Sequence, residues 1–233
     1  MLYPFYFDKT FILVIIGAVI SMLAQANIQK KFDKYKDVQS KKGITGAEAA
    51  QYVLDKNSYD DITIKKVRGS LSDYFNPVSK EVALSSESFH DSSIASLAVS
   101  LHEIGHVIQY KEGYMPLRLK SYIVPAVNFG SRLSFPVLVG GLIFSLPKLV
   151  SIGLMLFSLT LIFQLITLPV EFDASKRALR VLEESNILMA DELPGARSML
   201  KSAALTYVAA TITTALQFLR LIILFGNRSD RRN

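Results

Sequence analysis

Hydrophobic residues gather in a few long runs along this chain, with polar stretches between them. Residues 10–26 carry no charge, and residues 134–170 carry only Lys148. Residues 203–219 form a third apolar run, which ends before Arg220 and a basic tail. Because a helix of roughly 17–25 apolar residues crosses a bilayer, the first and third runs are each expected to form one transmembrane segment. The pattern predicts a membrane protein.

The middle run is too long for a single crossing, because as one helix it would measure about 55 Å. A hairpin that turns at Pro147 and Lys148 solves this, since a lysine at the bilayer centre would cost about 3 kcal/mol whereas a lysine at a turn reaches water. The arm 149–170 is long enough to cross. The arm before the turn is expected to be a shallow or tilted helix from which Arg132 extends to the interface. Residues 121–170 are therefore predicted to form a membrane hairpin, which brings the total to four transmembrane segments.

Residues 1–29 are predicted to form an N-terminal transmembrane segment. Ala24 and Ala26 make an Ala-x-Ala pattern behind a short apolar run, so a cleaved signal peptide is the alternative. A basic cluster after this run argues against translocation, because such clusters tend to stay in the cytoplasm. The cluster consists of Lys30, Lys31, Lys34, Lys36, Lys41 and Lys42.

Residues 30–120 have the mixed composition of a water-exposed domain. Thr45 can cap a helix there, and Asn76 and Pro77 mark a turn between two strands. Alternating apolar residues predict these strands, at Ile62 and Ile64 and at Val82 and Leu84. The strand at 80–85 is expected to pair with an extended peptide, as an exposed sheet edge would. The predicted fold class is membrane α-helical with a small α+β domain.

A longer helix is expected to follow, with Asp91 or Ser92 as its N-cap and Gly113 as its C-terminal stop. Its apolar positions recur at steps of three and four residues, at Ile94, Leu97, Ala98 and Leu101. This helix carries the sequence HEIGH. Isolated HExxH matches arise by chance in many proteins, so the independent helix signals around this one favour a functional motif.

The HEIGH motif has the spacing of a hydrolytic metal site. His102 and His106 are four residues apart, so on a helix they project from one face and can bind the same ion. Glu103 can accept a proton from the attacking water without being a ligand. Gly105 costs about 1 kcal/mol relative to alanine inside a helix, which indicates tight packing at this point. The chain has no cysteine, so a metal must be held by histidines and carboxylates.

A catalytic zinc takes three protein ligands and leaves a fourth position to water, so a third ligand must come from elsewhere. Glu171 is preferred, because it directly follows the apolar sequence LPV and because a hairpin returns it to the side of the membrane that holds His106. Its alternative role is that of a first-turn acid at a helix N-terminus. The polar stretch 171–202 is therefore expected to be a helical region that supplies the third ligand.

Other polar residues are weaker candidates. Asp173 can hold a ligand histidine through its second nitrogen, or it can be a capping or solvated residue. His90 stands before the HEIGH helix and is either a turn residue or part of the site. Basic residues near the membrane ends are expected to be interfacial anchors rather than substrate-binding groups; these are Arg132, Lys176 and Arg177.

Four segments of the chain carry a resemblance to a known family: SLHEIGHVIQ, LPVEFDASKRA, NPVSKEVALSS and VPAVNFGSRLSFP. Together they resemble the YugP-type neutral zinc metallopeptidases of bacterial membranes, and the likeness covers nearly the whole chain. It implies a zincin-like metallopeptidase domain of the gluzincin type, with one Zn²⁺ on His102, His106 and Glu171 and with Glu103 as the base. More distantly, the chain is similar to HtpX-like peptidases. These usually carry Asp where this chain has Ser175, which makes Ser175 a candidate neighbour of a ligand.

The predicted function is zinc-dependent hydrolysis of peptide bonds by a membrane-anchored endopeptidase. A non-catalytic zinc-binding membrane protein is the first alternative, although a purely structural site needs no base such as Glu103. A metal-free membrane scaffold or transport subunit is the second alternative, which metal analysis would separate. The sequence leaves the oligomeric state open.

Charge bears on partners and location. The net charge is +6, and the basic residues lie beside apolar stretches, which favours a lipid bilayer over nucleic acid as partner. Peptides or proteins are the expected substrates. More Lys and Arg flank the membrane segments on the side of the HEIGH motif than on the other side, so we expect a multi-pass protein of the cell membrane whose site faces the cytoplasm.

Overall fold

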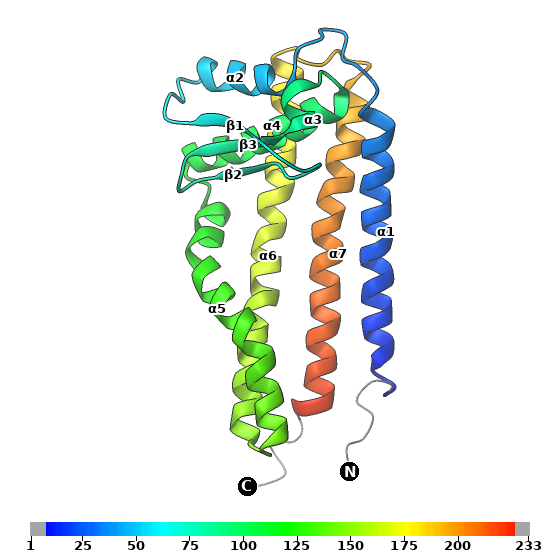
Figure 1. Cartoon of the computed structure of the whole chain (residues 1–233), viewed down its shortest axis with the longest axis vertical. Helices are drawn as coiled ribbons and strands as arrows, with labels where there is room; N and C mark the ends of the chain where they lie inside the picture. Colours follow the sequence, from blue (N-terminus) through cyan, green and yellow to red (C-terminus); the bar gives the residue numbers. More distant parts are fainter. Residues whose placement is uncertain (1–7, 227–233) are drawn as a thin grey trace. The chain divides into compact units, whose positions relative to one another are not determined.

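The computed structural model describes residues 8–226 and within them is mostly helical, with one small sheet (Figure 1). The helices are α1 (Phe11–Tyr35), α2 (Gly46–Lys56), α3 (Ser86–His90), α4 (Ile94–Lys111), α5 (Met115–Ile143), α6 (Pro147–Glu184) and α7 (Leu193–Phe225). The strands are β1 (Thr63–Val67), β2 (Tyr74–Asn76) and β3 (Glu81–Ser85). This confirms the predicted fold class, a membrane α-helical protein with a small α+β domain.

Four helices, α1, α5, α6 and α7, are long and apolar enough to cross a membrane, as predicted. Three of them extend well beyond the apolar runs. Helix α1 continues through the lysine-rich stretch to Tyr35, α6 continues to Glu184, and α7 begins at Leu193. Lysine, glutamate and arginine are good helix formers, so a helix has no local reason to end where its apolar run ends. The basic tail after Arg220 lies mostly outside the described residues.

The turn of the membrane hairpin lies at Phe144–Leu146, just before the predicted position. Ser145 has a positive φ of 54°, and the backbone N–H of Leu146 donates to the carbonyl of Gly141 at 2.8 Å. Pro147 is the first residue of α6, where its missing N–H and fixed φ suit a helix start. The upstream arm is one continuous helix, α5, with two prolines inside it.

The chain divides into two compact units, each built from separate segments. The first combines residues up to Ala24 with Arg118–Leu168 and the chain from Thr206 onward, and the second combines Gln25–Leu117 with Pro169–Leu205. Within the first unit, α1 and α7 approach closely, because the Thr213 hydroxyl donates to the carbonyl of Gly17 at 2.9 Å. All the residues of the HEIGH region and of the sequence EFDAS belong to the second unit.

The sheet of the second unit has the order β1-β3-β2, with β3 parallel to β1 and antiparallel to β2. Two expectations are corrected here. Asn76 and Pro77 do begin a turn, but it joins β3 to β2, a strand that was not predicted. The strand at 80–85 is central and therefore cannot offer a free edge to a peptide. Its residues Val82, Ala83 and Leu84 are fully buried in the main hydrophobic core.

Helix α4 runs through this core and is capped at both ends. Its N-cap is Ser93, whose hydroxyl accepts from the backbone N–H of Ser96, rather than Asp91 or Ser92. Asp91 ends α3, and the Ser92 hydroxyl donates instead to the side chain of Gln39 at 2.7 Å. At the other end Gly113 has a φ of +67°, as expected of a C-terminal stop.

The predicted cap of α2 is also confirmed. Thr45 and Glu48 form a capping box, in which each side chain receives a hydrogen bond from the backbone N–H of the other residue. Helix α2 then packs against α4 with Ala49, Ala50, Val53 and Leu54 buried.

Candidate metal centre

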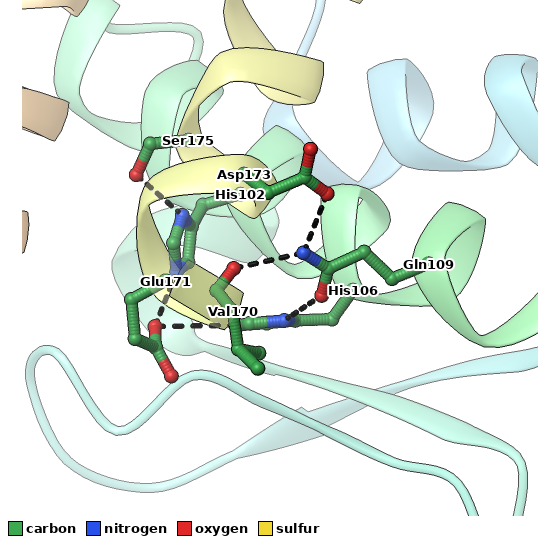
Figure 2. A network of polar contacts seen from close by, with 7 residues as sticks. All are labelled: His102, His106, Gln109, Val170, Glu171, Asp173 and Ser175. Atoms are coloured by element: carbon green, nitrogen blue, oxygen red, sulfur yellow. Dashed lines mark hydrogen bonds and ion pairs between the residues drawn. The ribbon is translucent and has the colours of Figure 1, made fainter. Parts of the chain in front are cut away.

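The two histidines of the HEIGH motif lie one turn apart on α4 and face α6. Their ring centroids are 4.8 Å apart, and their side chains are 14% and 11% exposed. Glu171 of α6 lies opposite them and is 2% exposed. Its Oε2 atom is 3.3 Å from His102 Nε2 and 3.5 Å from His106 Nε2 (Figure 2). Three side chains therefore direct one nitrogen or oxygen atom each towards a common point.

These spacings fit a metal ion. Ligands about 2.1 Å from a tetrahedral zinc lie about 3.4 Å from one another. The two distances to Glu171 match this value, and all three ligand atoms lie within 4.8 Å of one another. Two neutral imidazoles and one carboxylate are also a donor set that catalytic zinc takes, with a fourth position left for water. The residues present thus fit zinc in chemistry and in the two distances to Glu171.

Each histidine is held by a second residue at its other nitrogen. His102 Nδ1 is 3.3 Å from the hydroxyl of Ser175, and His106 Nδ1 is 3.0 Å from Oε1 of Gln109 (Figure 2). Such contacts set the orientation of a ligand imidazole and leave the Nε2 atom for the metal. Ser175 thus contacts the ring of His102, one of the candidate ligands.

Asp173 contacts no histidine directly. Its carboxylate accepts from the Gln109 amide at 2.8 Å and from Nε of Arg177 at 2.5 Å. Arg177 also pairs with Glu112 and lies over the ring of Tyr114, so its guanidinium is engaged inside this unit.

Glu103 is buried beside the ligands, with only 7% of its surface exposed. The pKa of Glu103 is raised to about 7, mainly by burial; the nearby His102 lowers it, and the charges of Glu171 and Asp73 raise it. The backbone N–H of Phe75 in β2 hydrogen-bonds to the same carboxylate and also lowers the pKa. A carboxyl group that titrates near neutrality suits a general acid and base.

Gly105 brings the two helices together at this point. A Cβ atom added to it would lie 2.4 Å from the carbonyl oxygen of Ala174 in α6, a distance shorter than real Cβ atoms adopt. The tight packing predicted at Gly105 is thus present, and its partner is the α6 turn that follows Glu171. This close crossing lets two histidines on one helix reach a carboxylate on the other.

Comparison with known proteins identifies the family of the chain. The chain matches the family described as "Putative neutral zinc metallopeptidase" over residues 10–226. The chain belongs to this family. It is also 38% identical over 221 residues to "Putative membrane protease YugP" of Bacillus subtilis (strain 168), which covers 94% of this chain and 98% of the relative. No solved structure matches. The resemblance inferred from the sequence is confirmed.

In this member of the zinc metallopeptidase family, the structure also shows where the remaining histidine, His90, lies. Among residues 8–226 the cluster of ligand atoms contains His102, His106 and Glu171 but not His90. His90 is exposed at the end of α3 and contacts the ring of Phe89 and the amine of Lys66. It is the last residue of a short helix and not the turn residue that was expected.

One residue beside the ligands was missed by the sequence analysis. Gln109 is fully buried and touches both His106 and α6. The signal available was its position three residues after His106, on the same face of the helix. A buried amide at that spacing looks like ordinary helix packing until the opposing helix is known.

Proposed function

We propose that the protein is a membrane-anchored, zinc-dependent endopeptidase. One Zn²⁺ per chain would be held by His102, His106 and Glu171, with Glu103 as the general base. Membership of the family and the name of the relative support a zinc peptidase of the membrane. The observation that carries the proposal is a cluster of three ligand atoms, with the Glu171 oxygen 3.3 and 3.5 Å from the two histidine nitrogens, beside a buried carboxyl group whose pKa is about 7.

Zinc, when bound, supplies a Lewis acid that polarises the scissile carbonyl and makes an attacking water more acidic. Glu103 accepts the proton of that water and passes it to the leaving amine. Its raised pKa lets it hold the proton between the two steps near neutral pH. The N–H of Phe75 fixes the carboxylate in place, and burial of Glu103 keeps bulk water from competing for the proton.

An extended peptide is the substrate that the sheet favours. With β3 in the centre, the outer strands of the sheet are β1 and β2. The N–H of Phe75 is directed to Glu103 and not to β3, so the outer edge of β2 faces the candidate base. A peptide paired along that edge would bring its backbone next to the ligands. We therefore assign peptide pairing to β2, in place of the central strand first expected.

The proposed location is the cell membrane, with the site on the cytoplasmic side. Helices α5 and α6 are both long and apolar enough to cross, so a chain that leaves the HEIGH helix and crosses twice returns to the same side before Glu171. The lysines after the first apolar run support a cytoplasmic face for that side.

Zinc content and peptide cleavage in one detergent preparation test the proposal. Wild type should hold one zinc and cleave a quenched peptide or casein. Glu103→Gln should keep the zinc but lose cleavage by two or more orders of magnitude, because the ligands remain and the base is gone. Glu171→Ala should lose zinc. The matched control is Glu184→Ala, an exposed glutamate on the same helix, which should behave as wild type.

The outcomes separate the alternatives. Folded wild type without zinc would refute the proposal and favour a metal-free scaffold. Zinc at one equivalent with no cleavage of any peptide tested, and with no difference between wild type and Glu103→Gln, would favour a non-catalytic zinc protein.

A further inference from the structure

Behind the candidate ligands lies a buried polar network centred on Gln109. This side chain is fully buried, and all its polar contacts lie within the second unit. Its Nε2 atom donates to the backbone carbonyl of Val170 and to the carboxylate of Asp173, each at 2.8 Å (Figure 2). A carbonyl and a carboxylate can only accept, so both N–H groups of the amide are committed to α6.

The two hydrogen bonds donated by the Gln109 amide determine which ring nitrogen of His106 carries a proton. Because Nε2 of Gln109 faces two acceptors, its Oε1 atom must face His106 Nδ1, at 3.0 Å. An amide oxygen only accepts, so Nδ1 must carry a proton. In a neutral imidazole the lone pair is then on Nε2, the atom that lies 3.5 Å from Glu171 Oε2.

We propose that Gln109 is a positioning residue that selects the metal-binding tautomer of His106 and fixes its ring. This role rests on the proposed function, since it concerns a ligand of the proposed zinc. Gln109 also ties α4 to the carbonyl of Val170, the residue directly before Glu171. One side chain thus aligns a ligand from each helix.

His102, the other histidine, is not held in one tautomer by its contact with Ser175. Its neighbour Ser175 offers a hydroxyl, which can donate or accept and so imposes no tautomer on His102. Asp173, in contrast, is itself held by Arg177, so the acceptor that orients Gln109 is fixed in place. Donation therefore runs from His106 through Gln109 to Asp173, and Asp173 accepts a second hydrogen bond from Arg177.

Zinc affinity, measured by competition with a chromophoric chelator, tests this role through exchanges that preserve shape. Gln109→Glu keeps an acceptor for His106 but sets a carboxylate against the Asp173 carboxylate and the Val170 carbonyl. It should weaken zinc binding by about 10–100-fold. Adding Asp173→Asn supplies an N–H towards the new carboxylate, so the double variant should recover to within about threefold of Asp173→Asn alone. Gln51→Met, an exposed glutamine on α2, is the control for Gln109→Met, which should also weaken binding.

Melting of the metal-free variants shows whether each one folds. If Gln109 served only to fill space, Gln109→Glu would leave the zinc affinity unchanged, because the two side chains have the same shape. Wild-type zinc affinity in Gln109→Glu, or a double variant no better than Gln109→Glu, would overturn the role of Gln109 while the zinc site stood. Absence of zinc from folded wild type would refute the proposed function and this role with it.

Discussion

Gly105 of α4 lies against the backbone of Ala174 of α6 so closely that no side chain fits between them. The two helices carry the histidines and the carboxylate of the candidate centre. The distance between the helices at this point is therefore also the distance over which the ligand atoms must meet, and a glycine sets it.

Gly105→Ala should lower both stability and zinc affinity. The added methyl would meet the Ala174 carbonyl, a backbone atom that cannot rotate away, so we expect a loss of about 1–3 kcal/mol in the free energy of unfolding. Thermal melting with and without zinc measures it. Gly140→Ala is the matched control, because its methyl would meet only a leucine side-chain carbon at 3.7 Å. Equal melting temperatures and zinc affinities for the two variants would contradict the close-crossing account.

The metal-free protein should lose stability as pH rises from about 4.5 to 7. Burial raises the pKa of Glu103 from 4.5 to about 7, so in that range the folded state binds a proton that the unfolded state has released. Stability from this group is full below pH 4.5 and falls by about 3 kcal/mol by pH 7. Melting curves in a chelator, compared with Glu103→Gln, isolate the effect. Parallel pH profiles for the two proteins would show that Glu103 is not responsible.

The capping box of α2 gives a prediction that does not involve metal. Thr45→Ala removes the acceptor for the N–H of Glu48 and should cost about 1 kcal/mol. Glu48→Gln keeps an oxygen for the N–H of Thr45, so its free energy of unfolding should lie within about 0.3 kcal/mol of the wild-type value. Thermal melting of both variants checks this, and a larger loss for Glu48→Gln would mean that charge, not capping, stabilises the helix start.

The orientation in the membrane can be read from single cysteines, since the chain has none of its own. Ser145→Cys lies in the exposed α5–α6 turn, and Val78→Cys lies in the β2–β3 turn, where Val78 is 91% exposed. In intact cells a membrane-impermeant maleimide should label position 145 only, and both positions after permeabilisation. Labelling of position 78 in intact cells would place the site outside the cytoplasm.

The sequence was sufficient to predict the parts of the site that follow from helix periodicity and from the even number of membrane crossings between His106 and Glu171. The four-residue step from His102 to His106 put both on one helix face. The lysine between two apolar arms required a turn, and that turn returned Glu171 to the same side. These inferences need only helix geometry and the cost of burying charge.

Features that depend on a neighbouring segment could not be predicted in this way. Strand β2 has three residues, too few for an alternating pattern, and it forms because β3 and Glu103 supply partners for its backbone. The cap moved to Ser93 because Gln39 takes the hydroxyl of Ser92. Gln109 gained its role from two acceptors on α6, which lie 61 and 64 residues further along the chain.

The distance in sequence between the candidate ligands also determines when the site can form during synthesis. His102 and Glu171 lie 69 residues apart, and α5 and the apolar part of α6 are translated between them. A ribosome-bound chain that has released HEIGH therefore lacks Glu171 until both membrane arms have been translated. The residues of the candidate centre are therefore all present only after the whole membrane hairpin has been translated.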